Sequence, residues 1–69
     1  MTAESFTAWL IDMKLAGLAH SDTECARLLG ISRSSIIKMK RSGADRRTAL
    51  ACRALLHRME PYGEKPAER

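Results

Sequence analysis

The fold is decided by residues 21–43, SDTECARLLGISRSSIIKMKRSG, in which one glycine separates two short helical patterns. Ser21 can accept a hydrogen bond from the backbone N–H three residues on, and Gly30 ends the first pattern after about two turns. Leu28 in this first pattern is expected to point inward. Ser32 follows two residues after Gly30 as the N-cap of a second helix. The stretch therefore predicts two short helices joined by a turn of about three residues.

The second of these helices, expected at about residues 33–41, has one apolar and one basic side. At about 100° per residue, Ile36 and Met39 fall on the same side and are expected in the core. The opposite side carries Ser34, Ile37, Lys38 and Arg41. For Ile37 two interpretations stay open: contact with a binding partner, or packing against the next helix or the chain after Gly43.

The rest of the chain predicts two further helices. Apolar side chains recur at three- and four-residue steps in Phe6, Trp9, Leu10, Met13 and Leu15, which predicts a helix over 3–16. Asp45 can cap a helix over 46–59 that is apolar around most of its circumference, and Pro61 ends it. We predict an all-α fold of four or five helices, with the first helix of the pair at about 22–29, one domain over 1–60 and a flexible tail at 61–69.

The composition restricts the class of protein. Sixty-nine residues bury only about 60 % of their unfolded surface, enough for one core. No apolar run approaches the roughly 20 residues that span a bilayer, and no signal peptide is evident, so we expect a cytoplasmic chain. Cys25 and Cys52 are expected to be small core residues without a disulfide. We expect no metal site, because His and Cys lie five residues apart in each pair, and no enzyme, small-molecule substrate or cofactor.

Charge is distributed unevenly along the chain. Residues 33–47 contain six basic residues and one acidic residue, a net charge of +5. Residues 1–24 contain four acidic residues and one basic residue, a net charge of −3. Such local asymmetry indicates a surface that binds a polyanion, and nucleic acid is the expected partner. Double-stranded DNA is favoured over RNA, because the sequence lacks the aromatic residues on which RNA bases stack.

The spacing within residues 22–39 also carries a family resemblance. Counting from Asp22, a small residue, Ala26, is at the fifth place and Gly30 at the ninth. Apolar residues at the fourth, eighth, tenth, fifteenth and eighteenth places complete the pattern: Cys25, Leu29, Ile31, Ile36 and Met39. This resembles the helix-turn-helix of the lambda repressor and Cro family. In size and layout the chain is also similar to short regulators of phages and mobile elements, including anti-CRISPR-associated autorepressors, which implies a bacterial or phage-infected cell.

The resemblance and the chemistry of the second helix predict which residues contact DNA. The major groove offers guanine acceptors to Arg and Lys and the thymine methyl to apolar groups. The predicted base contacts are Arg33, Ser34, Ile37 and Lys38. The predicted phosphate contacts are Thr23, Ser32, Lys40, Arg41, Ser42, Arg46 and Arg47. For Arg46 and Arg47 an ordinary solubilising role remains the alternative.

These residues predict a transcriptional regulator, most simply a repressor that occupies a promoter. One short helix reads only a few base pairs, so we expect a homodimer on an inverted repeat. Its interface is expected at Leu50, Ala54 and Tyr62. The rival hypothesis is an antitoxin or adaptor whose apolar fourth helix binds another protein. Small regulators of this kind often control their own genes.

Overall fold

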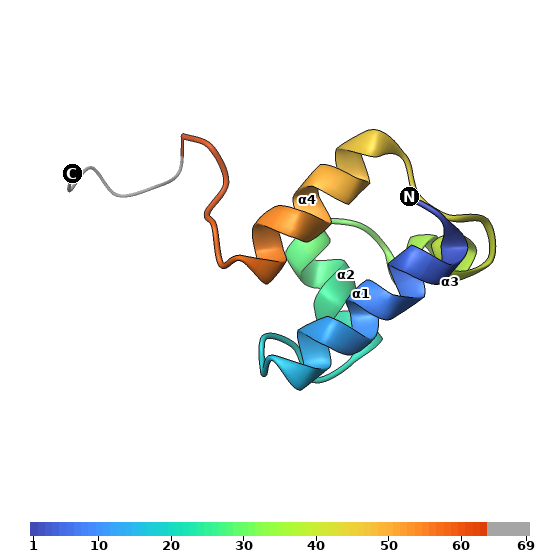
Figure 1. Ribbon diagram of the computed structural model, residues 1–69, viewed down its shortest axis with the longest axis horizontal. Coiled ribbons are helices and arrows are strands. Elements are labelled where there is room, and N and C mark those ends of the chain that lie inside the picture. The colour runs from blue at the N-terminus through green and yellow to red at the C-terminus, as the bar shows by residue number, and fades with distance from the viewer. Residues whose placement is uncertain (64–69) are drawn as a thin grey trace.

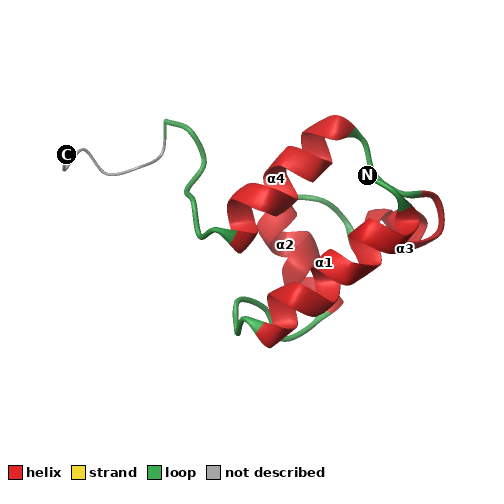
Figure 2. Cartoon of the chain, viewed as in Figure 1, coloured by secondary structure: helices red, strands yellow, loops and turns green. Residues whose placement is uncertain are grey.

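The computed structural model describes residues 1–63, which form four α-helices and no strand (Figures 1 and 2). The all-α prediction is confirmed, with four helices in the described part of the chain. Of the tail expected at 61–69, residues 64–69 lie outside the described residues. The helices are α1 (Ala3–Leu15), α2 (Asp22–Leu29), α3 (Arg33–Ser42) and α4 (Arg46–Leu56).

Each helix begins at a side-chain cap. The oxygen of the N-cap residue accepts a hydrogen bond from the backbone N–H three residues on, which satisfies a donor that the helix leaves free. Glu24 also accepts a hydrogen bond from the backbone N–H of His20 at 2.6 Å, one residue before the cap. The four caps are Thr2, Ser21, Ser32 and Asp45, of which only Thr2 was not expected.

The sequence predicts the ends of α1 and α2 but not the end of α4. Gly17 follows Ala16, the C-cap of α1, and Gly30 is itself the C-cap of α2; they adopt φ 74° and 76°, as expected for C-terminal glycines. The prediction that the fourth helix reaches residue 59 is wrong, because α4 ends at Leu56. There Arg58 adopts φ 61°, and the N–H of Met59 donates to the carbonyl of Ala54 at 2.9 Å. This Schellman-type closure needs no glycine in the sequence and was therefore not expected.

The core lies on the inner side of α1. Trp9 is buried there, and its indole N–H donates to the backbone carbonyl of Cys52 in α4 at 2.8 Å. Leu15 and Leu28 were predicted to face inward, but Leu15 is 81 % exposed and Leu28 about half exposed. Leu15 lies about 160° around α1 from Met13, away from the buried stripe. The buried core consists of Phe6, Trp9, Leu10, Met13, Ala19, Cys25, Ala26, Ile36 and Cys52.

The arrangement of the helices leaves one side of α3 uncovered. α1 packs against the other three helices, whereas α3 packs only against α1 and α2 in the described residues. α3 lies at the end of the molecule opposite the C-terminal end of α4 (Figure 1). None of the helices within residues 1–63 has the length and apolar character needed to cross a membrane.

The loop after α3 is fixed by the start of the chain. The N–H of Ala44 donates to the carbonyl of Met1 at 2.9 Å, and the nitrogen of Met1 donates to the carbonyl of Ala44 at 3.1 Å. Gly43 permits this approach with φ 90° and ψ −175°, a region that is essentially restricted to glycine. A Cβ atom at this position would lie 2.4 Å from the carbonyl oxygen of Met1. The end of α3 is therefore held in place by backbone contacts.

Candidate nucleic-acid interface

The two adjacent isoleucines of α3 lie on different sides of the helix. Ile36 is 0 % exposed, and Met39 packs against the same core. Ile37 is 48 % exposed. The exposed side of α3, here called the outer face, consists of Ser34, Ile37, Lys38 and Arg41. The core contacts of Ile36 thus determine which side chains of α3 are presented outward.

Arg33 joins the first turn of α3 to the first turn of α2. Its guanidinium Nη1 donates to the hydroxyl oxygen of Thr23 at 2.9 Å. Both side chains are exposed, so the pair lies beside the outer face and not beneath it. The bond uses one of the five N–H donors of the guanidinium and leaves the others free for a base or a phosphate.

Lys40 points toward α2. Its ammonium lies 3.0 Å from Oδ2 of Asp22, and the ammonium of Lys14 in α1 lies 2.8 Å from Oδ1 of the same carboxylate. The hydrogen bond from Lys14 lowers the pKa of Asp22; burial opposes this shift, and Lys40 adds to it. Asp22 therefore carries its charge at neutral pH and connects three helices.

The remaining predicted phosphate contacts lie at helix ends around α3. Ser32 is occupied as a cap, because its hydroxyl accepts from the N–H of Ser35 at 3.1 Å. Ser42 is exposed at the end of α3, and Arg46 and Arg47 are exposed in the first turn of α4. Arg47 lies 3.9 Å from the carboxylate of Asp45, the cap of that helix. Hydrogen bonds from Thr48 lower the pKa of Asp45, so the cap is charged at neutral pH.

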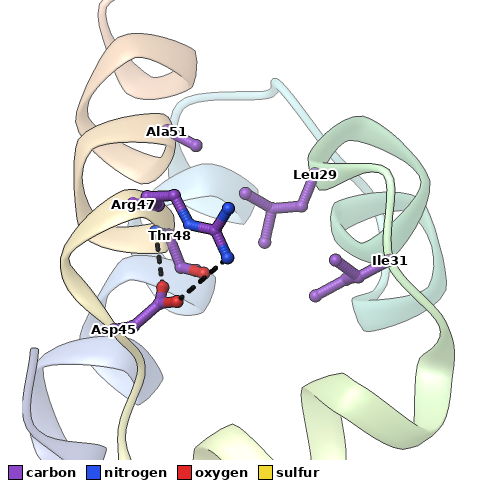
Figure 3. A pocket seen from close by; sticks show the side chains of 6 residues that line it. All are labelled: Leu29, Ile31, Asp45, Arg47, Thr48 and Ala51. Atoms are coloured by element: carbon purple, nitrogen blue, oxygen red, sulfur yellow. Dashed lines mark hydrogen bonds and ion pairs between the residues drawn. The ribbon is translucent and has the colours of Figure 1, made fainter.

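Two grooves border this region. The first, of about 270 Å³, lies between the α2–α3 turn and the start of α4. In Figure 3 Leu29 and Ile31 form one wall, and the polar side chains at the start of α4 form the other. The second, of about 400 Å³, runs beside the C-terminal half of α3 and includes Lys38 and Ser42 in its lining. The outer face thus continues into concave surface at its C-terminal end.

The cysteines take no part in this surface. Cys25 and Cys52 are buried and unpaired. Burial raises the pKa of both thiols, that of Cys52 to about 12. The thiols are therefore protonated at neutral pH and serve as small core residues, as the sequence predicts. Within residues 1–63 no three His, Cys, Asp or Glu side chains are grouped so that they could hold a metal ion.

The predicted dimer residues lie on and after α4. Leu50 is more than half exposed, Ala54 is half-buried and Tyr62 is fully exposed. Ala54 lines a groove of about 250 Å³ between α2 and α4, and Leu28 and Met59 belong to the same lining. Both of these lining residues leave apolar atoms exposed, Leu28 at 48 % and Met59 at 61 %.

Comparison of the chain with protein-family models, with curated proteins and with solved structures gave no significant match. The function is therefore inferred from the residues and their geometry.

Proposed function

We propose that this chain is a sequence-specific DNA-binding protein that regulates transcription and inserts α3 into the DNA major groove. The observation that carries the proposal is the outer face of α3, which presents Lys38 and Arg41 to solvent and contains no acidic residue. The opposite side of the helix is fixed in the core by Ile36. Two helices joined by a three-residue turn, with a basic second helix left uncovered, fit the docking of helix-turn-helix proteins.

The side chains of the outer face, together with Arg33 beside it, match the groups exposed in the major groove. Arg33 can donate two hydrogen bonds to O6 and N7 of a guanine, the most common specific contact. Lys38 and Ser34 supply further donors, and the exposed half of Ile37 can contact a thymine methyl. These four side chains are the proposed base contacts.

Phosphate contacts on both sides of α3 would orient the domain on the duplex. Thr23 lies at the start of α2, where the helix dipole favours an anion, and Ser32 lies at the start of α3. Arg41 and Ser42 occupy the last turn of α3. Arg46 and Arg47 would oppose the dipole at the start of α4, so a phosphate there would stabilise them.

The regulator is proposed to act as a homodimeric repressor. One recognition helix is too short to select a single site in a genome, and a symmetric dimer doubles the length read. Leu50, Ala54 and Tyr62 provide apolar surface for the dimer contact. Leu50 and Ala54 lie on α4, which does not pack against α3 in the described residues. The half-sites would then lie roughly 34 Å apart, one turn of DNA. Repression follows from occupation of a promoter, including that of the chain's own gene.

Footprinting on the DNA upstream of the chain's own gene tests this proposal. Parent protein should protect an inverted repeat. Arg33→Ala should lose preference for that site over random DNA, whereas Arg46→Ala should weaken binding to all DNA alike and flatten its salt dependence by about 0.9 in log–log slope. Equal binding of operator and random DNA by both variants and the parent would overturn it.

A second function is supported by the exposed apolar residues around the α2–α4 groove. Leu28 and Met59 line this groove, and Leu50 lies on α4; each is about half exposed or more, which leaves apolar surface suited to another protein chain. An antitoxin or adaptor would use this surface as its main binding site. A chain that stays monomeric by light scattering and binds no DNA would favour this function over the first.

A further inference from the structure

Asp22 lies between two lysines that come from two different helices. Its carboxylate oxygens are 2.8 Å from the ammonium of Lys14 in α1 and 3.0 Å from that of Lys40 in α3. The Asp22 side chain is 15 % exposed, whereas both lysine side chains are more than 40 % exposed. The acid that the two lysines share is therefore partly buried, and salt screens such a pair less than it screens two fully exposed charges.

The position of Lys40 on α3 differs from that of the other basic residues. At about 100° per residue, Lys40 lies roughly 40° from the buried Ile36, whereas Lys38 and Arg41 lie roughly 160° and 140° from it. Arg33 is on the same flank seven residues earlier, but its partner Thr23 is a neutral, exposed hydroxyl, and the bond leaves the other guanidinium N–H donors free. The first two residues of α2 thus hold α3 near both of its ends.

We propose that Asp22 is a positioning residue whose carboxylate keeps Lys40 out of the DNA contact, so that Lys40 fixes α3 against α1 and α2 and binds no phosphate. The part that concerns DNA rests on the proposed function, and the part that concerns the helices does not. From its charge alone Lys40 was predicted to contact a phosphate, whereas here it is assigned to the packing of α3.

Removal of the acid would have two effects. Without the carboxylate, the ammonium groups of Lys14 and Lys40 would repel each other, and α3 would lose a link to both neighbouring helices. The freed Lys40 side chain could then reach a phosphate. Asp22→Asn should therefore bind random DNA more strongly at low salt while its helices pack less firmly.

A double-mutant cycle tests the positioning role without DNA. Asp22→Asn, Lys40→Gln and the double variant are unfolded in urea alongside the parent, with Trp9 fluorescence as the signal. The expected coupling is about two- to fivefold in the unfolding equilibrium constant. A coupling factor of one would overturn the proposal.

The salt dependence of DNA binding tests the second part, with a mixed-sequence duplex as the probe. Arg41→Gln is the matched control on the outer face and should lower the log–log salt slope by about 0.9. Lys40→Gln should leave the slope unchanged, and Asp22→Asn should steepen it by a similar amount. An equal loss for Lys40→Gln and Arg41→Gln would overturn the proposal. If the parent binds no duplex, the proposed function fails, and the double-mutant cycle alone decides the role of Asp22.

Discussion

The adjacent isoleucines of α3 provide a matched pair of substitutions with opposite expected effects. Ile36 is 0 % exposed, so Ile36→Ala leaves a cavity in the core and should cost about 2–5 kcal/mol of unfolding free energy. A domain of 69 residues has roughly 3–10 kcal/mol of stability in total. Each kcal/mol shifts the melting temperature of a domain of this size by about 4–8 °C, so Ile36→Ala should lower it by at least about 8 °C or unfold the protein.

Ile37→Ala should have a small effect on stability. The substitution removes three carbon atoms worth about 0.8 kcal/mol each when fully buried, and 48 % of this side chain is already exposed. Alanine also has a higher helix propensity than isoleucine, which offsets a few tenths of a kcal/mol of this loss in stability. The net loss should stay below about 1 kcal/mol. If Ile37 contacts a thymine methyl, the same substitution should cost roughly fivefold in affinity for the operator, the equivalent of about 1 kcal/mol of apolar contact.

Two assays separate these expectations. Urea unfolding followed by far-ultraviolet circular dichroism gives the stability of each variant, and fluorescence anisotropy with operator and random duplexes gives the DNA affinity. Equal destabilisation by Ile37→Ala and Ile36→Ala would contradict the placement of Ile36 in the core and of Ile37 at the surface. The proposed base contact would be refuted if Ile37→Ala bound every sequence as the parent does.

Three further substitutions test the packing and the charges. Trp9→Phe removes a buried N–H donor to a backbone carbonyl of α4 and should lower stability by about 1–3 kcal/mol in urea unfolding, whereas an unchanged midpoint would contradict the hydrogen bond. Gly43→Ala should cost more than Gly30→Ala, because a Cβ at residue 43 meets the carbonyl of Met1 while residue 30 faces open space; thermal unfolding with the reverse order would contradict this. The pKa of Asp22 is lowered in the fold, so its charge stabilises the protein above about pH 4, near the ordinary pKa of an aspartate, and this contribution is lost as the pH falls through the lowered pKa. Asp22→Asn should therefore show a flatter dependence of stability on acid pH than the parent. Identical curves for the two proteins would argue against the ion pairs.

The sequence predicted the features that depend on local chemistry. Ser21, Ser32 and Asp45 cap helices in the structure because a side-chain oxygen and a backbone N–H three residues on are sufficient for the motif. Gly30 makes the turn because it tolerates a positive φ at no steric cost. The separation of Ile36 from Ile37 also followed from helical periodicity alone.

The features that the sequence did not predict depend on one unusual backbone conformation or on how the helices pack. The end of α4 depends on Arg58 in a left-handed conformation, which arginine adopts only at some cost in free energy. The exposure of Leu28 depends on which side of α2 faces α4. The contacts of Thr23 with Arg33 and of Asp22 with Lys40 join residues 10 and 18 positions apart, so no periodic pattern indicates them.

Binding of DNA by α3 is tested most directly by titrating isotope-labelled protein with a mixed-sequence DNA duplex and following the amide chemical shift of each residue. We expect the shifts to change most on the outer face of α3, at Ile37 and Arg41 among others, and in the first turn of α2. The exposed side of α1, including Ile11 and Leu15, should not change. Shift changes confined to the α2–α4 groove, or none at all, would contradict the proposal that α3 binds DNA.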